Sequence, residues 1–193
     1  MRRLLTVVFL FAVSYVSQLP FRSTPTVAAS IPIALRQPSI PQEDIQQTAY
    51  RRGNLHIVFS DKQKSMKVYN YRGILLLECA ASNEAINPGY GHHGKCPPGQ
   101  YRIGQIVRVG TPAFGEFFIP IRDITPDGPL HKYKRIGIGI HSGGSSLRNP
   151  FAPYQPLLRT HGCIRLHNID LPKLVRLIHN ARASGRITYI TIR

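Results

Sequence analysis

The chain has 193 residues, 42% of them hydrophobic, and a formal net charge of +16 at pH 7. This length and hydrophobic content predict one domain with a packed core and an appendage. The positive charge favours a polyanionic or carboxylate-rich partner. Because the basic residues are scattered and no nucleic-acid-binding motif is present, we expect no nucleic-acid partner, which leaves the anionic polymers of a cell envelope.

The N-terminus has the pattern of a secretory signal. Arg2 and Arg3 precede an apolar run at residues 4–16, and the small residues 27–29 resemble a cleavage site. This order is typical of export signals, and the run is short for a membrane-spanning helix. We expect residues 1–29 to be a signal peptide or an uncleaved signal anchor. The protein is therefore predicted to be exported to the periplasm or cell surface, with a membrane anchor as an open alternative.

Residues 30–51 are rich in proline and lack periodicity, which predicts a linker. The residue pattern then changes, and residues 55–82 predict three strands separated by two turns. A Gly/Pro-rich loop follows, and residues 100–110 and 135–142 are again typical of strands. Residues 111–135 mix short apolar runs with proline and glycine, and we interpret them as a long functional loop.

In the C-terminal part the spacing of the apolar residues changes. Residues 171–178 carry apolar side chains at helical spacing, with Asp170 as the N-cap, Pro172 in the first turn and Gly185 as the stop. Residues 186–193 then alternate with β-branched side chains, which predicts a final strand. The chain is thus expected to be mostly β, with one prominent helix.

The three cysteines are Cys79, Cys96 and Cys163. In an oxidising compartment an odd count leaves one thiol over when the other two pair. One interpretation is a Cys79–Cys96 disulfide with Cys163 free, and the other is three unpaired thiols. Spacing alone cannot establish the geometry of a bridge, so both remain open.

The stretch THGCIRLHN at residues 160–168 contains the candidate nucleophile, Cys163. A catalytic cysteine needs an electropositive setting, a base and oriented N–H donors for an oxyanion. His141 precedes a glycine-rich loop and is the candidate base for Cys163. The N–H groups of Gly162 and Cys163 are the candidate oxyanion donors, and His161 and Arg165 add positive character beside the thiol.

Cys163 has two other possible interpretations. A buried, inert thiol is the common role of a lone cysteine. A zinc site would use His161, Cys163 and His167, but the spacing His-x-Cys-x3-His matches no standard structural site. We therefore expect neither a metal nor a cofactor.

Ile-His-Ser at 140–142, followed by THGCIRLHN at 160–168, resembles the signature of the YkuD-type L,D-transpeptidase catalytic domain. The stretch CPPGQY at 96–101 resembles the Thr-Pro-x-Gly loop of that family, with Cys96 where threonine is usual. The resemblance covers roughly residues 52–193. It implies a mostly-β, sandwich-like catalytic domain with one helix after the cysteine motif.

The resemblance also implies a reaction on peptidoglycan stem peptides. Cys163 would attack the third residue of a tetrapeptide stem, release D-alanine and pass the acyl group to an amine, forming a 3→3 cross-link. It makes His141 the base and Gly162 an oxyanion donor, and it places His161 at the lining of the site. Site roles extend to Ser142, which would orient His141, and to Arg165 and Thr160, which would contact substrate. A hydrolase on the same scaffold, such as an L,D-carboxypeptidase, and a non-catalytic wall-binding module remain alternatives.

Overall fold

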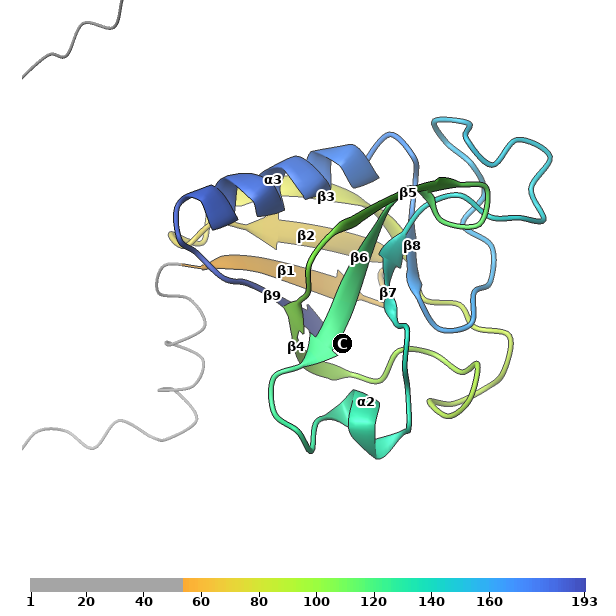
Figure 1. Ribbon diagram of the computed structural model, residues 1–193, viewed down its shortest axis with the longest axis horizontal. Helices are drawn as coiled ribbons and strands as arrows, with labels where there is room; N and C mark the ends of the chain where they lie inside the picture. Colours follow the sequence, from red (N-terminus) through yellow and green to blue (C-terminus); the bar gives the residue numbers. More distant parts are fainter. Residues whose placement is uncertain (1–53) are drawn as a thin grey trace, which may run out of the picture. The chain divides into compact units, whose positions relative to one another are not determined.

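The computed structural model describes residues 54–193, which contain nine strands and two helices (Figure 1). The predicted signal segment 1–29 and linker 30–51 lie outside the described residues. The strands are β1 (Leu55–Ser60), β2 (Ser65–Tyr69), β3 (Leu75–Ser82), β4 (Gly99–Ile103), β5 (Val107–Thr111), β6 (Gly115–Asp123), β7 (Gly139–His141), β8 (Ile164–Leu166) and β9 (Thr188–Ile192). The helices are α2 (Pro129–Lys132) and α3 (Leu171–Ala183). Within the described part, no helix is long and apolar enough to cross a membrane.

The strands form one sheet in the order β4-β9-β1-β2-β3-β8-β7-β6-β5, and β4 also pairs with β6. That extra pairing joins the two halves of the sheet, so they enclose a shared core. Most neighbours are antiparallel, whereas β1 pairs with β9 and β7 pairs with β8 in parallel. The expected mostly-β, sandwich-like fold with one long helix after the cysteine motif is confirmed.

The three predicted N-terminal strands are confirmed as β1, β2 and β3. Ile57 and Phe59 of β1 pair with Val68 and Met66 of β2, and all four side chains are fully buried. Side chains alternate across a strand, so this set covers one face of the hairpin. Their sequence alternation was therefore a direct signal of the core face.

The predicted C-terminal helix is α3, which packs against β1, β9 and β6. Leu171, Leu174 and Ile178 are fully buried at its core face. Asp170 stands at the N-cap position, but its carboxylate pairs with Lys173 at 2.9 Å rather than capping the backbone. The chain then turns and enters β9, as the alternation of residues 186–193 predicted.

The interpretation of residues 111–135 as one long loop was wrong. The stretch at 115–123 forms β6, the longest strand, which pairs with β4, β5 and β7. Pro120 lies within β6, and its carbonyl accepts a hydrogen bond from the N–H of Gly104 at 2.8 Å. The strand was not predicted from the sequence because its proline and glycine residues normally mark turns.

Candidate active site

A cavity of about 590 Å³ lies between β7, β8 and the loops around them. Cys163 and His141 both line it, together with four cationic side chains and no acidic one. Its polar and charged lining residues are His92, His93, Lys134, Arg135, His141, Ser145, Ser146, Arg159, Thr160, His161, Cys163 and Arg165. Such a lining favours an anionic ligand, because charges of one sign in a cleft concentrate ligands of the opposite sign.

The register of β7 and β8 brings the predicted nucleophile and base to one face. The two strands are parallel, and His141 lies opposite Arg165. Because side chains alternate along a strand, Cys163 points to the same side as Arg165 and hence as His141. Cys163 is 7% exposed and His141 is 3% exposed, so both reach the cavity from its buried wall.

His141 is held in one tautomer. Its Nδ1 lies 2.6 Å from the carbonyl oxygen of Ser142. A carbonyl oxygen only accepts, so Nδ1 carries the proton and donates it, which leaves a lone pair on Nε2. Burial lowers the pKa of His141 to about 4, with a smaller lowering from Arg165, while the bond to Ser142 opposes both. The imidazole is therefore neutral at pH 7 and able to accept a proton at Nε2.

Cys163 is a thiol in the resting site. Burial raises its pKa, although the N–H of Gly139 and the charges of Arg135 and Arg165 act in the opposite direction. The Sγ atom lies 3.7 Å from the carbonyl oxygen of Gly137, which accepts the thiol proton. With a neutral thiol and a neutral imidazole lining one cavity, nucleophilic attack by Cys163 requires that proton transfer accompany it.

Thr160 closes the turn that presents Cys163. Its hydroxyl accepts the N–H of Gly162 at 3.0 Å and donates to the carbonyl of Cys163 at 2.8 Å. The N–H of Gly162 thus has a partner within the turn, and its expected role as an oxyanion donor stays a prediction. The hydroxyl of Thr160 makes both its bonds inside the turn, and the residue also lines the cavity, so its contact with substrate stays a prediction.

The sequence offered no signal for the role of Arg135. Its Nη1 lies within 3.2 Å of the carbonyl oxygens of Tyr90, Gly91, Gly94 and Lys95, and its Nη2 donates to the carbonyl of His161 at 2.6 Å. The two N–H groups on Nη1 are shared among those four acceptors. One guanidinium therefore joins the glycine-rich loop to the cysteine turn.

Gly162 is required where these segments meet. Its φ is +105°, a conformation that side chains rarely adopt. A Cβ there would overlap the carbonyl oxygen of Gly94 and Nη2 of Arg135. Glycine therefore permits the close contact between the cysteine turn and the loop.

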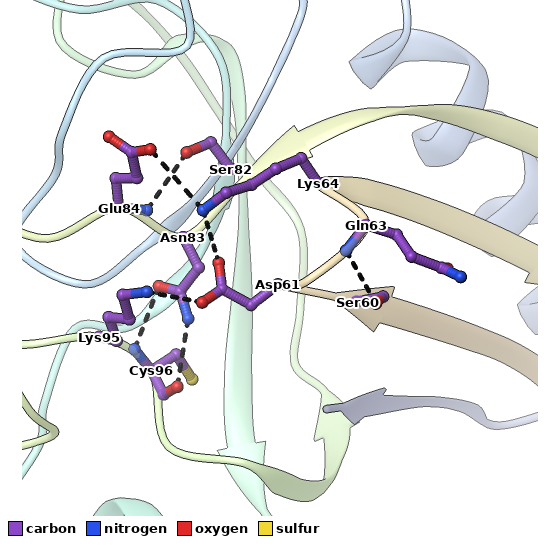
Figure 2. Close-up of polar contacts among 9 residues, drawn as sticks. All are labelled: Ser60, Asp61, Gln63, Lys64, Ser82, Asn83, Glu84, Lys95 and Cys96. Atoms are coloured by element: carbon purple, nitrogen blue, oxygen red, sulfur yellow. Dashed lines mark hydrogen bonds and ion pairs between the residues drawn. The ribbon is translucent and has the colours of Figure 1, made fainter.

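A polar network fixes the base of the same loop (Figure 2). The side chain of Asn83 donates to the carbonyl of Cys96 and accepts its N–H, both at 3.1 Å. Asp61, in the β1–β2 turn, pairs with Lys95 at 2.6 Å and with Lys64 at 2.9 Å. These contacts hold both ends of the segment whose middle forms one wall of the cavity.

Arg165 is a charged residue that is buried in the wall of the site. It is 6% exposed, yet its Nε and one of its Nη atoms have no hydrogen-bond partner. Burial lowers its pKa, and no carboxylate of the described residues pairs with it. A buried guanidinium with two unpartnered nitrogens is costly unless a ligand supplies acceptors.

The other predicted residues divide between the cavity and the core. The ring of His161 lines the cavity and lies 4.3 Å from that of His93. His167 does not line it, since its Nδ1 lies 2.9 Å from the carbonyl of Gln155. The described residues contain no group of three or more His, Cys, Asp or Glu arranged to hold a metal ion.

Of the two interpretations of the cysteines, the structure has the three unpaired thiols, all of them buried, and no Cys79–Cys96 bridge. The charges that act on Cys79 come from Asp170 and Lys173 near the start of α3, whereas Cys96 is affected by Cys163 and Arg135. Burial raises the pKa of Cys79 to about 12 and also raises that of Cys96, so neither is reactive at neutral pH.

Residues 46–183 match the YkuD family, the L,D-transpeptidase catalytic domain. The chain belongs to this family. A search of curated proteins found no match to this L,D-transpeptidase family member.

Solved structures share the fold of this YkuD domain. The helical cell shape determining protein Pgp2 from Campylobacter jejuni is 20% identical with a TM-score of 0.54, and the match covers 72% of this chain and 47% of Pgp2. Bd1075 from Bdellovibrio bacteriovorus is 17% identical with a TM-score of 0.50, over 72% of this chain and 48% of Bd1075. The match thus spans about half the length of each, and identities this low show a shared fold alone.

Proposed function

We propose that the chain is an exported peptidoglycan L,D-transpeptidase with Cys163 as nucleophile and His141 as base. The observation that carries this proposal is that both residues face one cationic cavity, with the lone pair of His141 Nε2 left available by the bond to Ser142. Membership of the family supplies the reaction type. The predicted signal at residues 1–29 supports delivery to the periplasm or cell surface, where stem peptides are found.

Donor binding places a carboxylate of the stem peptide against Arg165. The guanidinium has an unpartnered Nε and an unpartnered Nη, and a carboxylate of the donor would supply an acceptor beside this buried charge. Pairing also removes the cost of burying an unsatisfied charge. Because a tetrapeptide stem ends in the carboxylate of D-alanine, this contact selects a donor with a free C-terminus.

Acylation then begins with the Cys163 thiol and the His141 imidazole both neutral. Sγ of Cys163 attacks the carbonyl carbon of the third residue while Nε2 of His141 takes the thiol proton. The N–H of Cys163 serves the oxyanion, because the N–H of Gly162 is bonded to Thr160. The C–N bond breaks as His141 returns the proton to the departing amine, which leaves as D-alanine. The product is a thioester on Cys163.

The acceptor determines the outcome. An amine from a second stem gives a 3→3 cross-link, whereas water gives a tripeptide and makes the enzyme an L,D-carboxypeptidase. Both outcomes would alter the cell wall, and the fold shared with a cell shape determining protein is in line with a role in cell-wall organisation and cell shape.

Mass spectrometry of products tests the proposal. The purified protein would be incubated with disaccharide-tetrapeptide, beside Cys163→Ala and a matched thiol control, Cys79→Ala. Cross-linked dimer that lacks one D-alanine, formed by the wild type and by Cys79→Ala but not by Cys163→Ala, is expected. Tripeptide alone would favour the carboxypeptidase. Equal products from Cys163→Ala would exclude Cys163 as the nucleophile, and the absence of product from all three proteins would favour a wall-binding module.

A further inference from the structure

The domain has a second distinctive surface, which we call the distal end. It comprises the turn at 70–74, the starts of β1, β3 and β9, and the last turn of α3. In Figure 1 these segments lie at the left of the domain, whereas β7, β8 and the connection between them lie at the right. The hollows at the distal end share no lining residue with the catalytic cavity.

Aliphatic side chains are exposed together at the distal end. Ile74, Leu75 and Leu76 follow one another and are 55%, 45% and 43% exposed, and Ile187 before β9 is 45% exposed. The first part of β3 pairs only with β2, because β8 reaches just its last two residues. Adjacent exposed aliphatic residues at an open strand are typical of an interaction surface.

Two arginines flank these aliphatic residues and share one aromatic ring. The guanidinium carbon of Arg186 lies 4.0 Å from the ring centre of Tyr71, and that of Arg72 lies 5.3 Å from it. Neither arginine forms an ion pair within the described residues. Two neighbouring cations without a carboxylate favour an external anion.

The surroundings contain little negative charge. The segments 54–60, 69–77 and 176–193 contain no aspartate or glutamate. Glu78, further along β3, is paired with Lys67 at 3.2 Å. A hollow of about 550 Å³ lies beside Tyr71 and Arg72, again with no acidic residue in its lining. This polar, cationic hollow next to exposed aliphatic side chains is the combination that a lipid headgroup and its acyl chains require.

The point at which the chain enters the domain is consistent with a lipid partner. The described domain begins at Asn54, whose side-chain oxygen accepts the N–H of Ile187 at 3.1 Å, so the preceding residues join the domain at the distal end. Those residues include the apolar run at 4–16. The described domain is thus connected to the preceding sequence at the end that carries the exposed aliphatic side chains.

A second copy of the chain fits this surface less well. In a two-fold dimer the same patch meets itself, so the interface would contain Arg72 and Arg186 from both copies with no carboxylate from the patch to pair with them. Like charges brought together in this way oppose association. A soluble anionic polymer would pair with the arginines but leave the aliphatic side chains exposed to water.

We propose that the distal end is a membrane-docking surface for anionic phospholipid. Ile74, Leu75, Leu76 and Ile187 enter the headgroup–acyl boundary, and Arg72 and Arg186 bind the phosphates. The catalytic cavity then points away from the bilayer. Such docking holds the enzyme near the membrane whether or not residues 1–29 are cleaved.

The absence of tryptophan from the sequence allows a local test on the full-length protein. Leu75→Trp places a single indole at the distal end, and Tyr154→Trp places one at a residue that is 70% exposed in the β7–β8 connection. Each variant would be added to vesicles of phosphatidylcholine with one part phosphatidylglycerol in three, with and without acyl-chain bromination. We expect a blue shift and bromine quenching for the indole at position 75 and neither effect for the one at position 154.

The local signal separates docking from anchoring by the N-terminus. Bound protein in which the indole at 75 stays unquenched, or in which both positions are quenched alike, would overturn the proposal. A blue shift without lipid would mean that protein covers this surface, and would also overturn it. Replacing both arginines by glutamine should weaken vesicle binding by about fivefold for each lost cation. Unchanged binding would remove their role, and neither result bears on the reaction at Cys163.

Discussion

The carbonyl of Ser142 accepts a 2.6 Å hydrogen bond from Nδ1 of the adjacent His141, in a position where the imidazole is 3% exposed. The bond fixes the tautomer, but burial is the larger influence and lowers the pKa of His141 to about 4. The imidazole of His141 is therefore neutral at pH values well above 4.

This shift predicts acid sensitivity of the fold. Unfolded His141 takes up a proton near pH 6.5, whereas folded His141 does so only near pH 4, so the unfolded state binds more protons between those values. The contribution of His141 to stability is full above pH 6.5 and falls as the pH drops, by roughly 3 kcal/mol at pH 4. Urea titrations of the wild type and His141→Gln across this range measure it. Parallel curves for the two proteins would contradict the assignment.

Thr160→Val tests the turn that presents Cys163. The substitution keeps the shape of the side chain but leaves the N–H of Gly162 and the carbonyl of Cys163 without their partner. We expect a loss of about 1–3 kcal/mol in unfolding free energy and a marked loss of acylation rate. Thr160→Ser, which retains the hydroxyl, is the matched control and should keep most of both. Equal effects from valine and serine would mean that the hydroxyl bonds contribute little.

The sequence predicted β1, β2, β3, α3 and β9 because their core faces follow local periods of two or of 3.6 residues. It did not predict β6, since Pro120 interrupts the pattern. The pairings of β4 with β6 and of β1 with β9 join distant segments, and no local pattern encodes them.

At the site, Cys163 and His141 were identified by their motif, and the register of β7 and β8 supplies their shared face. The use of the Gly162 N–H and the role of Arg135 were not predictable. Both features depend on hydrogen bonds to backbone atoms. Because every residue has these atoms, the amino-acid sequence does not indicate which of them are used.

Arg135→Lys tests the link between the glycine-rich loop and the cysteine turn. A lysine ammonium is a compact charge and cannot reach both Gly94 and His161 as the planar guanidinium does. We expect a loss of about 2–4 kcal/mol in stability and faster amide hydrogen exchange at residues 84–98. The exposed Arg102→Lys is the control. Unchanged exchange in the loop would show that other contacts, such as those of Asn83, suffice to hold it.

Arg165→Met separates a substrate-binding arginine from a structural one. The buried guanidinium lacks partners at Nε and at one Nη, so replacing it with an apolar side chain of similar length removes an unsatisfied charge. We expect the folded state to become more stable by about 1–3 kcal/mol. If the empty positions serve a donor carboxylate, the same variant should raise KM for tetrapeptide by at least tenfold, while a donor amidated at its C-terminus should show little difference between the two proteins. A structural arginine would give the opposite pair of results, with lower stability and an equal loss on both donors. Denaturant titration together with kinetics on the two donors therefore decides why a guanidinium is buried in this wall of the cavity.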